Sequence, residues 1–97
     1  MTHAVVFRPQ AEEEARAART WYEHRKMGLG VRFADAISEA IRRIASNPLA
    51  FPLVHGETRR AIVRSFPFAA FWVHGDDVVI LAAMHGRRHP REWQIRR

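Results

Sequence analysis

The sequence predicts an α+β domain in which a helical hairpin packs on one face of a small, mainly antiparallel sheet, with the element order β-α-α-β-β-β. Two stretches of helical periodicity follow one another early in the chain, separated by the glycine-containing segment "MGLG". The second half changes to short runs with the two-residue period of strands. Because the 97 residues are 47% hydrophobic and include no cysteine, we expect one globular domain over residues 1–97, with no disulfide and no thiolate metal site.

The first half begins with a short strand and continues with a long helix. The apolar run from Ala4 to Phe7 is followed by Pro9, a residue suited to the first turn of a helix. The next segment, "QAEEEARAARTWYEHRK", is rich in helix-forming residues. Its three glutamates suit the positive end of the helix dipole, and we expect them to be solvated there. The residues that recur on its apolar side are mostly alanine, and such small residues would allow close approach by another helix or by a second chain: Ala11, Ala15 and Ala18, followed by Tyr22.

A second helix follows, and the expected turn between the two contains Gly28 and Gly30. Apolar residues again recur at helical spacing, at Phe33, Ala34, Ile37, Ile41 and Ile44. The segment "SNP" at residues 46–48 is a typical helix end. Two helices joined by so few residues predict an antiparallel hairpin.

The second half predicts a loop and three strands. "LAFPLVHGET" is interpreted as a loop anchored by Phe51, Leu53 and Val54. In "RRAIVRSF" the residues Arg60, Ile62, Arg64 and Phe66 alternate with smaller ones, which is typical of a strand. "FAAFWVHGDDVVILAAM" reads as two apolar strands joined by a turn at residues 74–77.

The charge distribution points to an acidic partner. The formal net charge is +6, and fifteen of the sixteen basic residues are arginine, whose planar fork binds phosphate and carboxylate well. From His85 onward five arginines face a single acid, Glu92. A basic C-terminal end suits a polyanion or an acidic protein. No segment approaches the roughly 20 apolar residues of a membrane span, so we expect no membrane association and a cytoplasmic location.

This order of elements, with the residues that fill it, resembles the RelE/ParE superfamily of toxins from bacterial type II toxin–antitoxin modules. The segments that carry the resemblance cover nearly the whole chain: "WYEHRKMGLGVRF" (21–33), "AIRRIASNPLAFP" (40–52), "RRAIVRSFPFAAFWV" (59–73) and "AAMHGRRHPREW" (82–93). Among its branches, the WY, GLG and NP elements and the RR-x-x-V-x-x-FP-[YF] pattern look most like the ParE-like, plasmid-stabilisation group.

The resemblance implies a toxin that arrests growth and is neutralised by a cognate antitoxin with an acidic C-terminal segment, the pair reaching operator DNA through the antitoxin. ParE-like members are understood to poison DNA gyrase, and RelE-like members to cut messenger RNA on the ribosome. The fold alone does not choose between these targets. We therefore keep three hypotheses: a ParE-like gyrase poison without catalytic residues, a RelE-like endoribonuclease, and a non-toxic module that only binds antitoxin or DNA.

The candidate site residues lie in the second half. Arg60 and Arg64 are expected on one strand face that the helices leave uncovered, and arginines on such a face would bind an acidic antitoxin segment or a phosphate backbone. The candidate binding residues are these two with Arg59, beside Arg60, and Arg87 and Arg88, which follow the last strand. We expect Arg87 and Arg88 to be held beside Arg64. If the chain is an endoribonuclease, His85 is the general base, because its unperturbed pKa suits proton transfer. The sequence offers no convincing proton donor, since Tyr22 lies on a helix where it packs.

Trp93 is expected either to contact the target or to anchor the C-terminal segment to the core. Only Arg96 and Arg97 would then trail in solvent as a basic tail. His85 and His89 have the spacing of metal ligands on a helix, but Gly86 and Pro90 argue against a helix there. We expect neither a metal nor a cofactor.

Overall fold

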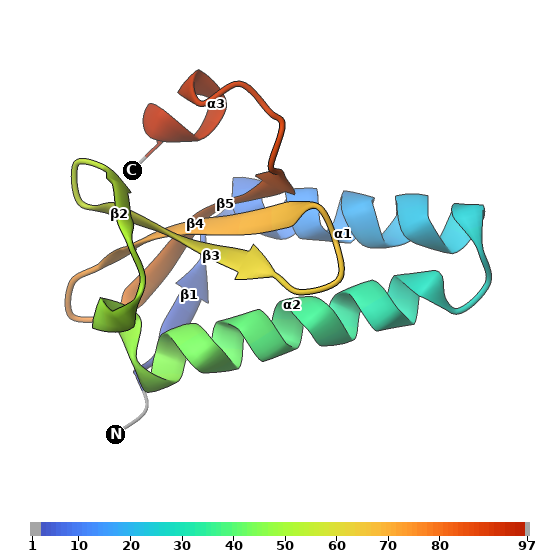
Figure 1. The fold of residues 1–97 in the computed structure, drawn as a ribbon, viewed down its shortest axis with the longest axis horizontal. Helices are drawn as coiled ribbons and strands as arrows, with labels where there is room; N and C mark the ends of the chain where they lie inside the picture. The colour runs from blue at the N-terminus through green and yellow to red at the C-terminus, as the bar shows by residue number, and fades with distance from the viewer. Residues whose placement is uncertain (1–2, 97) are drawn as a thin grey trace.

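The computed structural model describes residues 3–96, which form a five-stranded mixed sheet with two long helices on one face. The strands are β1 (Val5–Phe7), β2 (Leu53–His55), β3 (Thr58–Val63), β4 (Phe68–His74) and β5 (Val78–His85). Their order across the sheet is β1-β5-β4-β3-β2, and only the β1–β5 pair is parallel (Figure 1). The predicted α+β fold is therefore confirmed.

Helices α1 (Pro9–Arg25) and α2 (Leu29–Ser46) form the predicted hairpin and lie together along the sheet (Figure 1). The main core lies between them and the sheet, where Ala11 and Ile44 meet Trp72 and Ile80. A second cluster lies near the helix turn and joins Tyr22 and Phe33 to Phe66 and Phe68 through edge-to-face ring contacts. The small residues of α1 permit this close packing because they add little bulk between helix and sheet.

Only one of the two glycines expected in the turn between the helices lies in that turn. Gly28 lies in the turn with a φ of +88°, a left-handed conformation that favours glycine. Gly30 instead lies inside α2, where its backbone N–H donates to the Glu23 carboxylate at 2.9 Å. Glu23 also accepts from the Gly28 N–H, at 3.0 Å. A carboxylate from the end of α1 therefore satisfies the free N–H groups at the start of α2.

The segment expected to be a loop contains an additional edge strand. After a single turn of 3₁₀ helix (Pro48–Ala50), β2 pairs antiparallel with β3. The interpretation of this segment as a loop was wrong because its three-residue strand is too short to show a two-residue period.

A short C-terminal helix, α3 (Arg91–Gln94), lies on the sheet face opposite α1 and α2 (Figure 1). Its Trp93 is buried and joins Ala69, Phe71, Ala82 and Met84 in a separate apolar cluster. Both faces of the central strands are thus covered, which explains why β5 is a nearly continuous apolar run. Among the described residues, no helix is long and apolar enough to cross a membrane.

Candidate functional site

A depression of about 280 Å³ lies at one end of the sheet, between Ala69 and Phe71 of the face covered by α3 and Phe66 and Phe68 of the cluster near the helix turn. Arg60, on β3, faces it because it pairs with Phe71 across the sheet, and Phe71 belongs to the face covered by α3. His85, Gly86 and Arg87 border it where β5 ends. The remaining wall is apolar and comes from β3, β4 and the turn between them: Ile62, Phe66, Pro67, Phe68, Ala69 and Phe71.

The charges of this depression come from Arg60 and Arg87. Both side chains are exposed, and within residues 3–96 neither takes part in an ion pair. Ile62, more than half exposed, lies two residues from Arg60 on the same face of β3. An apolar floor with two available guanidinium groups suits a ligand that combines an apolar side chain with a carboxylate or phosphate.

His85 borders the depression, but one of its ring nitrogens is already engaged. The backbone N–H of Arg87 donates to His85 Nδ1 at 3.0 Å. This hydrogen bond assigns the neutral imidazole proton to Nε2, which leaves that nitrogen as a donor. The ring also packs edge-on against Phe68, with ring centroids 5.9 Å apart. In this arrangement the imidazole shapes the turn after β5 and has no free lone pair with which to accept a proton.

The other three candidate arginines do not reach the depression. Arg59 lies at the start of β3 and donates to the Phe51 carbonyl at 2.6 Å, where it ties β3 to the segment before β2. Arg88 pairs with Glu92 at 2.8 Å. Arg64 and Arg88 have separate partners, on α2 and α3, and Arg64 does not line the depression that Arg87 borders, so within the described part of the chain the three arginines expected together share no common partner or pocket.

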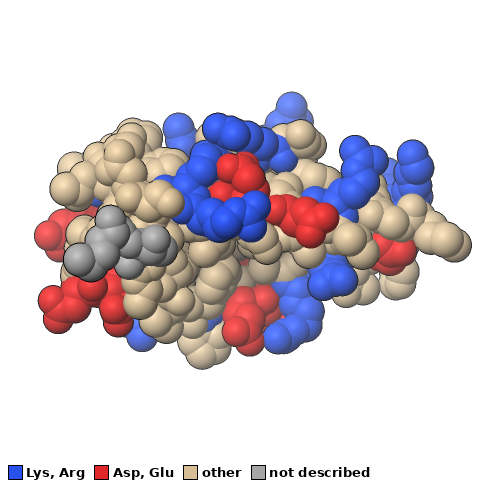
Figure 2. Space-filling model, turned by 90° about the horizontal axis from the view of Figure 1, so that it is seen from below, with Lys and Arg blue, Asp and Glu red and all other residues tan. Residues whose placement is uncertain are grey.

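Arg64 lies beyond the end of β3 and turns toward α2, where its guanidinium is 3.6 Å from Glu39. Glu39 also pairs with Arg43 at 2.7 Å. Figure 2 shows the face of the molecule over α2, where Lys and Arg side chains lie among Asp and Glu side chains. The arginines of this face are therefore partly neutralised by neighbouring acidic side chains. The alternating pattern of the strand could not have shown that β3 ends before Arg64.

Trp93 is placed as a packing residue. Its ring stacks on Phe71 with centroids 4.2 Å apart and planes inclined by 12°, and its side chain is 7% exposed. Phe71 also lines the depression, so Trp93 packs against one of the residues that form its wall. This position agrees with an anchoring role and leaves little of the indole surface for a partner.

Within residues 3–96, the structure brings neither Tyr22 nor a group of three metal ligands to the depression. Tyr22 packs among Phe33, Phe66 and Phe68, and burial raises the pKa of its phenol, so the ring stays neutral at physiological pH. In the part of the chain that the structure describes, no three histidine or acidic side chains come close enough together to hold a metal ion.

Two residues that the sequence placed in solvent instead meet in a partly buried contact. Arg96, expected in a free tail, forms an ion pair with Glu14, expected at a solvated helix start. Arg97 lies outside the described residues. The two partners are 82 positions apart, so no local pattern could have paired them.

Comparisons with known proteins agree with this architecture. The model of a family described as the ParE toxin of the type II toxin–antitoxin system parDE matches residues 5–90. Among solved structures, the chain is similar to a protein titled "Chromosomal ParDE TA system from P. aeruginosa", with a TM-score of 0.72 and 17% sequence identity. The match covers 87% of this chain and 96% of that one. No curated protein matches the chain. Because the family model spans most of its length, this chain belongs to the family of ParE toxins of type II toxin–antitoxin systems.

Proposed function

We propose that this chain arrests growth by binding DNA gyrase in the cytoplasm, and that a cognate antitoxin neutralises it. The proposal rests chiefly on one observation: the Nδ1 lone pair of His85 accepts the Arg87 backbone N–H and is therefore occupied. This occupation argues against the alternative in which His85 is the general base of an endoribonuclease. RNA cleavage requires a group that accepts the proton of the attacking hydroxyl and another that donates a proton to the leaving oxygen. The depression offers cations and apolar surface, which are suited to holding a protein partner.

The decisive experiment replaces His85 and follows both activities. His85→Asn keeps an acceptor oxygen near the position of Nδ1 and removes the imidazole. We expect this variant to arrest growth and to trap cleaved gyrase–DNA complexes as strongly as the wild type. Primer extension on transcripts from induced cells is run beside the gyrase assay. Loss of growth arrest in His85→Asn, together with new cuts in wild-type transcripts, would refute the proposal.

The basic rim of the depression supplies a second test. Arg60→Gln and Arg87→Gln each remove one unpaired guanidinium, and we expect a reduction of at least about tenfold in gyrase inhibition, the equivalent of about 1.4 kcal/mol. Arg16→Gln is the matched control, because Arg16 lies on α1 and pairs there with Glu12 and Glu13. Equal loss in all three variants would show that net charge, not this rim, drives binding.

The same charges support neutralisation by an acidic antitoxin segment. A protein of net charge +6 with unpaired arginines attracts an acidic chain over long range. We expect the association rate of toxin with antitoxin to fall steeply as salt is raised, and to fall less steeply for Arg60→Gln. An association rate that does not depend on salt would exclude this mode of recognition.

One observation favours the RelE-like alternative: Arg60, His85 and Arg87 line a single depression. Under that reading the arginines hold the scissile phosphate, and His85 must exchange its hydrogen bond with Arg87 before it can act as a base. Truncated transcripts in the primer-extension arm, with normal supercoiling, would favour this alternative over gyrase poisoning.

A further inference from the structure

The end of the C-terminal segment, residues 86–96, is fixed to α1 by an ion pair with two parallel hydrogen bonds. Arg96 Nη1 and Nη2 donate to Glu14 Oε1 and Oε2, each at 2.8 Å. The two side chains are only 13% and 19% exposed. A forked pair of this kind is directional, and its low exposure protects it from screening by salt.

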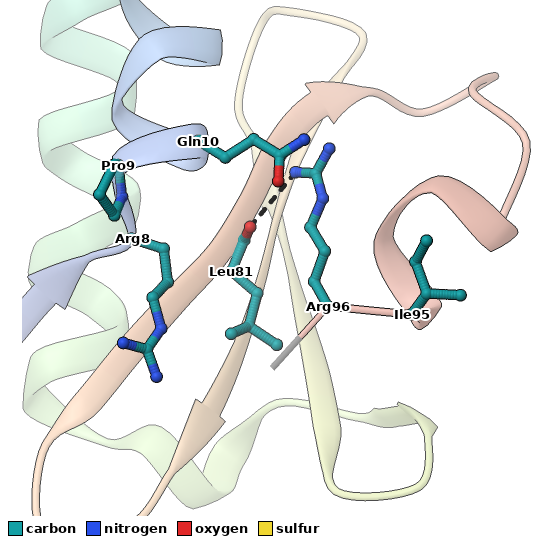
Figure 3. A pocket seen from close by; sticks show the side chains of 6 residues that line it. All are labelled: Arg8, Pro9, Gln10, Leu81, Ile95 and Arg96. Atoms are coloured by element: carbon teal, nitrogen blue, oxygen red, sulfur yellow. Dashed lines mark hydrogen bonds between the residues drawn. The ribbon is translucent and has the colours of Figure 1, made fainter.

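The same two side chains close an open edge of the sheet. Strand β1 pairs with β5 only from Val78 to Ile80, so the following part of β5 has no neighbouring strand on that side among the described residues. There the Ala83 N–H donates to Glu14 at 3.1 Å, and Arg96 donates to the Leu81 carbonyl at 3.3 Å. Figure 3 shows Arg96 reaching back from the end of α3 to this carbonyl. Unsatisfied edge groups of this kind would otherwise pair with water or with another chain.

The ion pair is connected to the candidate site through the C-terminal segment. At the start of the segment, the Gly86 N–H donates to the Pro67 carbonyl at 2.8 Å. In its middle, Trp93 stacks on Phe71. At its end, Arg96 holds Glu14. Arg87 lies between the first two attachments, so the path of its backbone depends on both of them.

We propose that Glu14 and Arg96 form a latch that holds the C-terminal segment in place and thereby positions Arg87 and Trp93 at the candidate site. Neither latch residue lines the depression, so both are positioning residues. When the latch opens, the segment turns about Gly86, Trp93 leaves Phe71, and the edge of β5 at Leu81 and Ala83 is exposed. The activity part of this proposal rests on the proposed gyrase function, whereas the structural part does not.

The test uses the full chain with Arg96→Gln, and follows Trp93 by NMR. Stacking on Phe71 shifts the Trp93 ring resonances through ring currents, so undocking gives a distinct signature. We expect that shift to shrink and the Trp93 amide to exchange at least about tenfold faster, while amides of β4 stay protected. Gyrase inhibition should weaken by about tenfold, the equivalent of about 1.4 kcal/mol. Glu14→Gln should reproduce both effects, and Glu13→Gln, which alters an exposed neighbour on α1, should reproduce neither.

Arg96→Lys separates positioning from general stability, because lysine keeps the charge but lacks the planar fork. It should restore part of the Trp93 shift and part of the inhibition together. It also serves as the test variant if Arg96→Gln does not fold. A stacked, protected Trp93 in Arg96→Gln would overturn the latch. So would full inhibition by a variant whose Trp93 is released. Wild-type protein that leaves gyrase unaffected would refute the proposed function alone, and release of Trp93 in Arg96→Gln would still support the latch.

Discussion

The contact between α1 and α2 at Gly30 gives a quantitative test of how the hairpin is packed. A Cβ at position 30 would lie 2.8 Å from the Arg19 carbonyl oxygen and 2.9 Å from Glu23 Oε1. The first of these is a backbone atom of α1, so the substitution Gly30→Ala must push the two helices apart. Overpacking costs about 1–3 kcal/mol, and a clash with backbone, which no change of rotamer relieves, falls in the upper part of that range, about 2–3 kcal/mol. Alanine recovers up to about 1 kcal/mol of helix propensity over glycine.

The net expectation for Gly30→Ala is a loss of about 1–2 kcal/mol in the free energy of unfolding, or a fall of about 5–10 °C in Tm for a chain of this size. Thermal and urea unfolding measure it. Gly75→Ala is the matched control, because among the described residues no atom beyond its two chain neighbours lies within 4 Å of the added Cβ, and the residue lies outside the left-handed region. We expect that control to change stability by less than about 0.5 kcal/mol. A Gly30→Ala variant as stable as the wild type would refute the close helix contact.

Three further predictions concern Glu23, Trp93 and Ser65. The N–H groups of Gly28 and Gly30 hold the pKa of Glu23 below its ordinary value of 4.5, so its contribution to stability is present above that pH and is lost as pH falls through the lowered pKa. The gap in Tm between wild type and Glu23→Gln should therefore close on acidification, and a gap independent of pH would contradict this reasoning. Trp93→Ala should cost about 3–5 kcal/mol by urea unfolding, against less than about 1 kcal/mol for the half-exposed Trp21→Ala; similar losses would exclude an anchoring role. Ser65→Gly should raise stability by about 0.5 kcal/mol, because Ser65 has a φ of +72°, and a destabilised variant would show that this backbone is not strained.

Much of the fold could be predicted because the signals are local. The helical spacing of Phe33, Ile37, Ile41 and Ile44 requires only that one side of a helix faces a core, and α2 forms there. The turn at residues 74–77 between two apolar runs predicted the β4–β5 hairpin, whose strands end and begin at His74 and Val78. The basic residues around His85 were also predicted as a candidate site, and Arg60 and Arg87 do line one depression with it.

The sequence by itself determined the order and type of the main elements, because the periodicity of a helix or a strand depends only on residues close together in the sequence. The tertiary structure alone decided which side chains meet. Arg64 turns to Glu39 because β3 stops one residue before it, and His85 Nδ1 is engaged because the turn after β5 brings the Arg87 N–H to it. Arg96 reaches Glu14 because the C-terminal segment runs along the sheet face opposite α1 and α2, where Trp93 stacks on Phe71. These contacts join distant positions or depend on the path of a turn, and no periodic pattern in the sequence specifies either.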